Sequence, residues 1–193
     1  MKKLHSILYV ILLVAILSAC GSGSAPETSP ETPEAPEMQA PTVSVEEYKT
    51  MVSEFNAHLM DEALILANAG MYEYNYWKTF SGLPAYGDLD YQSMAESAME
   101  WLSEKSDASA ETVEAAYGEL IASCVDISDA NVDGDIPEEL PDLVVALFGA
   151  YDCLYSLVTE PSGEIEDFVV QLRDYTEVIT TFNEDISSLV EGI

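Results

Sequence analysis

The sequence predicts an all-α fold: an antiparallel up-and-down bundle of four to five helices that follows a disordered tether. Three observations predict it. Apolar residues recur every three or four positions over most of the chain after residue 44, no segment alternates convincingly like a β-strand, and residues 21–43 have a different composition. Because 48% of the 193 residues are apolar, the helical region is able to bury a core.

The clearest helical pattern lies at the C-terminal end, after Pro161-Ser162, which we expect to start the helix. Its apolar residues are separated alternately by three and four positions, as in the seam of a coiled coil. The seam serves an intramolecular bundle or a dimer equally well. It consists of Ile165, Phe168, Leu172, Tyr175, Ile179, Phe182, Ile186 and Leu189.

The first predicted helix begins at a capping box formed by Ser44 and Glu47. We expect it to continue past an aromatic-rich stretch and to stop at Gly82, before Leu83-Pro84. The stripe that we expect to face inward consists of Val45, Tyr48, Val52, Phe55, Leu59, Ala63 and Leu66, followed by Tyr74 and Trp77.

Three more helices are predicted between these two, over about 90–105, over about 109–127 and from Pro141 onward. Short connections favour antiparallel neighbours. The residues expected to face inward are Met94, Ala98, Trp101 and Leu102 in the first, Val113, Tyr117, Leu120, Cys124 and Ile127 in the second, and Val144, Leu147, Tyr151, Leu154 and Val158 in the third.

The N-terminal region carries a targeting signal. Lys2-Lys3 precede an apolar run over 7–16, which is too short for a permanent membrane span but suits a signal peptide. Leu17-Ser18-Ala19-Cys20 then resembles the lipobox of bacterial lipoproteins. The resemblance implies cleavage before Cys20, diacylglycerol on its sulfur and often a further acyl chain such as palmitate on its amine. Two or three acyl chains hold a protein firmly on a membrane.

We therefore expect three segments: a signal peptide over 1–19, a lipidated cysteine with a linker over 20–43, and an acidic helical bundle over 44–193. The linker is rich in Pro, Glu, Ser and Thr and has almost nothing apolar to bury. Its prolines favour extended polyproline II, and its glutamates repel one another. The linker is interpreted as a spacer between the cell membrane and an extracytoplasmic domain.

The charge balance narrows the choice of partners. The chain has 6 Lys and Arg against 36 Asp and Glu, for a net charge of −30. Nucleic acid binding depends on basic residues that neutralise phosphates, so nucleic acid is not an expected partner. The electrostatic field of this negative charge repels anionic polymers and attracts cations. Because the acids are scattered rather than blocked, they also suit a solvated, non-sticky surface.

Residues 129–140, between two predicted helices, resemble the calcium loop of EF-hand and dockerin-type modules. Asp129, Asn131 and Asp133 match its first three side-chain ligands, and Asp135 is placed to contribute its backbone carbonyl. Leu140 stands where that family has a closing glutamate, so the loop departs from the pattern. The alternatives are a calcium site and an ordinary polar turn around Asp-Gly.

Cys124 and Cys153 remain after Cys20 takes lipid, and both fall on or beside apolar stripes of neighbouring helices. Outside the cytosol they are candidates for a disulfide, with two buried free thiols as the alternative.

His58 has Glu54 and Glu62 four residues away on either side, but it lacks the spacing and the second histidine of a di-metal site. We expect no metal centre there and no catalytic cysteine.

A dense aromatic cluster includes Tyr72, Tyr74, Tyr76 and Trp77. It suits a ligand platform or, alternatively, core packing under the following loop.

No nucleotide loop, nucleophile elbow or zinc-protease helix is present in the sequence. The sequence thus favours a lipid-anchored, non-enzymatic binding or interaction module. A purely structural envelope component is the first alternative, and an enzyme is the second.

Overall fold

The computed structural model describes residues 42–80, 91–105 and 108–193, which belong to one compact unit, Pro41–Ile193. The signal peptide, Cys20, nearly all of the linker and the Gly82-Leu83-Pro84 segment lie outside these residues. The elements in chain order are β1 (Thr42–Ser44), α2 (Val45–Phe80), α3 (Tyr91–Lys105), α4 (Ala110–Ser128), β2 (Asn131–Asp133), α5 (Leu140–Thr159) and α6 (Ile165–Glu191).

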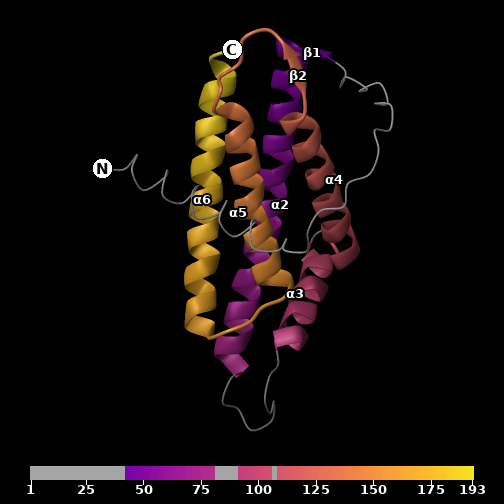
Figure 1. Ribbon diagram of the computed structural model, residues 1–193. Coiled ribbons are helices and arrows are strands. Elements are labelled where there is room, and N and C mark those ends of the chain that lie inside the picture. Colours follow the sequence, from indigo (N-terminus) through magenta and orange to yellow (C-terminus); the bar gives the residue numbers. More distant parts are fainter. Residues whose placement is uncertain (1–41, 81–90, 106–107) are drawn as a thin grey trace, which may run out of the picture. The chain divides into compact units, whose positions relative to one another are not determined.

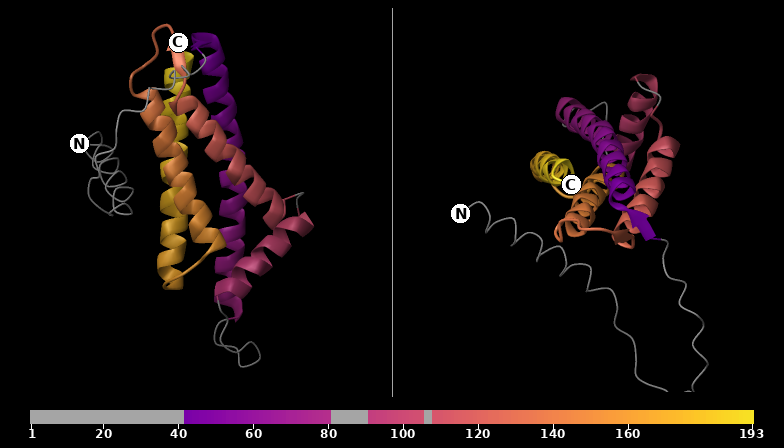
Figure 2. Two further views of the ribbon diagram at one scale, coloured as in Figure 1. Left: turned by 45° about the vertical axis from the view of Figure 1, so that its right-hand side comes forward. Right: turned by 90° about the horizontal axis from the view of Figure 1, so that it is seen from above.

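The helices form an up-and-down bundle, as the sequence predicts (Figure 1). The long helices α2 and α5 run in one direction, and α4 and α6 run in the other. The structure describes five helices, and two of them, α3 and α4, follow each other along one side of the bundle. They meet at an angle instead of forming a straight rod (Figure 2). α4 packs on both α2 and α5, whereas α3 packs mainly on α2.

Two helix starts show how local sequence sets these boundaries. At the start of α2, the Ser44 backbone N–H donates to Glu47 Oε2 at 2.8 Å, and the Glu47 N–H donates to Ser44 Oγ at 3.2 Å, so the predicted capping box is confirmed. Ser109 and Thr112 make an equivalent reciprocal pair at the start of α4. Both boxes satisfy backbone groups that a helix end leaves without partners.

A short pair of strands was not predicted. β1 and β2 run parallel, with Val43 opposite Val132, and they connect the start of α2 to the segment between α4 and α5. Three residues are too few to show an alternating pattern, so this strand pair left no signal in the sequence. Gly134 follows β2 with φ of 143°, and a Cβ there would lie 2.5 Å from Val45 Cγ2.

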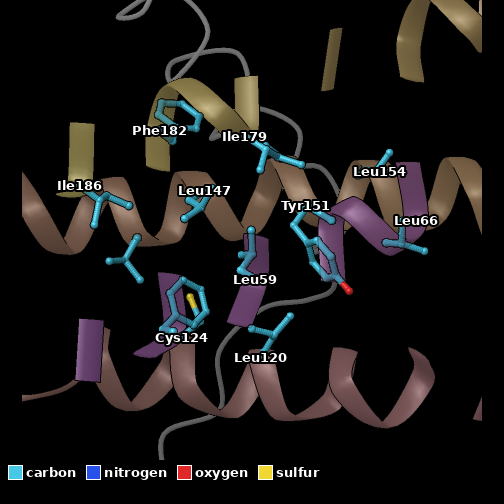
Figure 3. Packing of buried hydrophobic residues seen from close by; sticks show 14 of the residues in the cluster. Leu59, Leu66, Leu120, Cys124, Leu147, Tyr151, Leu154, Ile179, Phe182 and Ile186 are labelled. Atoms are coloured by element: carbon cyan, nitrogen blue, oxygen red, sulfur yellow. The ribbon is translucent and has the colours of Figure 1, made fainter. Parts of the chain in front are cut away.

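The core lies along the bundle axis, where α2, α4, α5 and α6 each point apolar side chains inward (Figure 3). Most residues of the C-terminal seam are buried within this same chain, which favours its intramolecular use. Every inward position predicted for α5 is buried, as are four of the five predicted for α4, where Tyr117 is half-buried. The largest fully buried side chains include Tyr48, Leu59, Leu66, Leu120, Leu147, Tyr151, Leu154, Phe168 and Ile179.

Two predicted details differ in the structure. α6 begins at Ile165 and not directly after Pro161, because Gly163 adopts φ of 90° in the intervening turn. The buried stripe of α2 continues after Leu66 through Ala69 and Glu73, whereas Tyr74 and Trp77 are half-buried. The inward-facing positions predicted from the sequence therefore do not match the buried face in the last turns of α2.

α5 is the one helix of the described ranges that is long and apolar enough to cross a membrane by length and composition alone. A core helix passes the same test. In the structure α5 packs on α2, α4 and α6, and its buried residues run from Leu140 to Val158. This packing accounts for its apolar composition.

We predict that Gly134→Ala destabilises the domain by about 1–3 kcal/mol, because the backbone there is strained for any side chain and Val45 occupies the space of the new methyl group. Chemical denaturation measures the change.

Gly118→Ala is the matched control. Gly118 lies on the exposed face of α4 with nothing within 4 Å of an added Cβ, so alanine there should stabilise the helix by up to about 1 kcal/mol. Equal effects of the two substitutions would contradict the assigned role of Gly134.

Candidate functional site

The residues of the calcium-loop resemblance follow an extended path in the structure. Asp129 caps the C-terminal end of α4, and Asn131 and Asp133 lie at the two ends of β2. The Asn131 side-chain amide donates to Thr42 Oγ1 at 3.2 Å, which ties it to β1. Asp135 is exposed beyond Gly134. An EF-hand loop instead curls around its ion so that alternate side chains converge.

Across the described residues, no three His, Cys, Asp or Glu side chains gather closely enough to hold a metal ion. The calcium site stays a prediction that rests on the sequence resemblance.

The two cysteines of the bundle are free thiols in the structure, and a disulfide between them stays a prediction. Cys124 is buried on the inner face of α4. Cys153 of α5 is half-buried, and its thiol interacts with Tyr175 of α6. Burial raises the pKa of both thiols, which disfavours the reactive thiolate.

His58 lies half-exposed on α2, and its Nε2 is 3.9 Å from Glu62 Oε1 on the next turn. This weak contact within one helix is a surface feature. Burial raises the pKa of Glu62, while the charge of His58 lowers it.

The predicted aromatic platform is divided between two sides of α2. Tyr72 stacks on Trp101 of α3 with ring centroids 4.9 Å apart, and Tyr76 lies 6.1 Å from Tyr72. On another side, the Lys78 ammonium lies 5.6 Å from the centroid of the Tyr74 ring. Trp77 is half-buried. The Tyr72–Trp101 stack holds α3 against α2, so part of the cluster packs between helices and no single flat platform forms.

A groove between α3, α4 and the C-terminal end of α5 is the best candidate binding site. It has a volume of about 760 Å³, within the usual range for small-molecule sites. Its surface is mostly apolar, with contributions from Ala95, Met99, Val113, Tyr155 and Pro161. We call it the α3–α5 groove.

Stacked tyrosines support one wall of the α3–α5 groove. The rings of Tyr155 and Tyr117 have centroids 4.1 Å apart and an interplanar angle of 17°. The Tyr117 hydroxyl donates to Asp152 Oδ1 at 2.5 Å, and this hydrogen bond is the main reason why the pKa of Tyr117 rises to about 12. The stack joins α4 to α5, so Tyr155 is held in place before any ligand arrives.

A second open groove, of about 720 Å³, lies between α2 and α6. Its lining includes Met71, Val170 and several threonines together with Arg173 and Glu177, so both charge signs are present. Arg173 is already paired with Asp174 at 3.2 Å. This groove presents no single chemical character that selects a class of ligand.

Glu73 is an unusual acid in the core. Its side chain is 0% exposed, and neither carboxylate oxygen has a hydrogen-bond partner. Burial alone raises its pKa to about 8. Buried acids with perturbed pKa values are candidates for function, but Glu73 does not line either groove and no second carboxylate is buried beside it within the described residues.

Sequence reasoning missed both Glu73 and the α3–α5 groove. A signal for Glu73 was present, because it lies seven residues after Leu66 and fourteen after Leu59, on the same inward stripe. The groove had no comparable local signal, since its walls come from three helices. Comparison of the chain with protein-family models, with curated proteins and with solved structures finds no match.

We predict that Glu73→Gln stabilises the protein increasingly as the pH rises from 5 to 8. In the folded protein the pKa of Glu73 is about 8 instead of the ordinary 4.5, so the neutral acid is favoured. The stability contributed by Glu73 is fully present below pH 4.5, falls by up to about 1.4 kcal/mol per pH unit above it, and levels off above pH 8. Glutamine stays neutral throughout.

Melting temperatures of the two proteins across this pH range test the prediction. Glu54→Gln, an exposed position of the same helix, corrects for the general effect of removing one negative charge. A difference between wild type and Glu73→Gln that stays constant with pH would mean that the charge of Glu73 is not the cause.

Proposed function

We propose that this protein is a lipoprotein anchored at the extracytoplasmic face of a membrane, and that its helical domain binds a small ligand without catalysing a reaction. Support for the anchor comes from the order of Lys2-Lys3, the apolar run and Leu17-Ser18-Ala19-Cys20. The Pro- and Glu-rich segment that follows suits a spacer that keeps the domain away from the lipid surface.

The single observation that carries the binding proposal is the α3–α5 groove. A bundle that only fills space needs its helices packed along their whole length, yet here α3 stands apart from α5 and leaves about 760 Å³ open. The open space is lined mainly by apolar side chains. Apolar lining with a few polar groups at the edge is the usual composition of a small-molecule site.

A structural envelope component remains the alternative. An acidic, solvated surface and a long tether suit that role equally well, and the binding test below separates the two proposals.

For the anchor, we predict that the full chain incorporates a labelled fatty acid when it is expressed in a bacterium that processes lipoproteins, and that Cys20→Ser abolishes the label. The thiol is the acyl acceptor, so serine removes the bond while leaving the signal otherwise unchanged. Gel analysis of the labelled protein and the mass of its mature N-terminus report the result. Equal labelling of both proteins would exclude Cys20 as the attachment site.

For the groove, we predict that Ala110→Trp abolishes ligand binding. Ala110 lines the α3–α5 groove at the exposed first turn of α4, so the larger ring fills the groove with little disturbance of the core. Ala115→Trp is the control, because Ala115 is also exposed on α4 but lies outside the groove.

Three soluble probes share one phenylbutyl body and end in an amine, an alcohol or a carboxylate. Binding to the full chain in neutral-lipid nanodiscs is measured by calorimetry, with empty nanodiscs as the reference. We expect at least one probe to bind saturably, to lose affinity by about tenfold or more in Ala110→Trp and to keep it in Ala115→Trp. If no probe binds, the structural alternative is favoured.

A further inference from the structure

The edge of the α3–α5 groove carries charge of one sign. Three exposed glutamates from three helical segments line it: Glu96 of α3, Glu114 of α4 and Glu160 at the end of α5. Among the residues that the structure describes, no Lys, Arg or His belongs to its lining. A charge field of this kind around an apolar surface attracts cations and repels anions.

The three carboxylates are available to a ligand. The ion pairs found within the described residues are His58–Glu62 and Arg173–Asp174, and neither involves the groove. Glu96 accepts one hydrogen bond at 3.0 Å from the Gln92 amide, a neutral donor that leaves its charge uncompensated. A cationic ligand would therefore not have to displace a basic side chain.

Tyr155 connects the apolar surface to this acidic edge. Burial is the first cause of its raised pKa, and the negative charges of Glu114 and Glu160 add to it, so both carboxylates act on the Tyr155 hydroxyl. The negative potential thus reaches the wall of the groove. A tyrosine ring also attracts organic cations through its π face.

The spread of the three carboxylates around the edge of the groove does not suit a bare metal ion. A divalent metal needs several oxygens within one coordination shell, and no group of three suitable side chains gathers in the part of the chain described by the structure. Dispersed carboxylates around an apolar surface suit a bulkier ion whose charge is spread and whose body is apolar.

From the apolar surface, the Tyr155 ring and the three unpaired glutamates, we propose that the ligand of the α3–α5 groove is a small organic cation, with an ammonium group at the acidic edge and an apolar body in the groove. This inference rests on the proposed binding function and names the class of its ligand.

The phenylbutyl series tests the inference, because the three probes differ in charge and share the apolar body. We expect the amine to bind more tightly than the alcohol and the carboxylate more weakly than either. The affinity for the amine should fall as salt rises, since exposed charges are screened over about 10 Å at 0.1 M ionic strength. The affinity for the alcohol should change little with salt.

Two matched variants each remove three negative charges, one from the edge of the α3–α5 groove and the other from the surface of α6. Combined substitution of Glu96, Glu114 and Glu160 by Gln should weaken amine binding by about tenfold or more and leave alcohol binding within about twofold. In the control variant, Gln replaces Glu177, Glu184 and Glu191 of α6, which are also exposed and lie away from the α3–α5 groove. It removes the same net charge and should leave the affinity for the amine nearly unchanged.

The outcomes separate the two proposals. If the alcohol binds as tightly as the amine and Ala110→Trp blocks both, the groove is a binding site but the cation inference is overturned. The cation inference is also overturned if both triple variants weaken amine binding equally, because the net charge and not the groove is then responsible. If none of the probes binds, the proposed binding function itself fails. Melting curves of each variant verify that the bundle is folded.

Discussion

The packing of α2 against the four other helices that the structure describes is the constraint on which the rest of the structure depends. α2 is 36 residues long, so one side of it spans both α3 and α4 while other sides pack on α5 and α6. Gly70 lets α2 approach α5 and α6 closely. A Cβ at this position would lie 2.7 Å from Leu172 Cδ1 and 3.2 Å from Val158 Cγ2, so a larger residue would force these side chains to shift.

The α3–α5 groove exists because two shorter helices, α3 and α4, occupy the side of the bundle where one long helix could lie. α2 holds α3 by the Tyr72–Trp101 stack, and the capping box of Ser109 and Thr112 starts α4 in a new direction. The same break brings acidic residues from three helices to the edge of the groove, where their charges act together.

Polar groups in the core are few, and they differ in how well they are satisfied. The Asn56 side-chain amide donates to Ser187 Oγ at 3.2 Å and to the Asn183 carbonyl at 3.4 Å, which links α2 to α6. Glu73 has no such partner and remains buried because its stripe also contains Leu59 and Leu66. A buried acid is tolerated most easily as the neutral form, since desolvation penalises its charge. The raised pKa of Glu73 is therefore a direct consequence of α2 packing.

The sequence by itself determined the class of fold, the approximate ends of the helices and most inward-facing residues, because caps and apolar spacing act over a few neighbouring positions. Only the tertiary structure decided the pairing of β1 with β2 and the burial of Glu73. It also decided the α3–α5 groove, whose walls lie far apart in the chain. The physical reason is that each of these features depends on contacts between segments whose meeting no local pattern records.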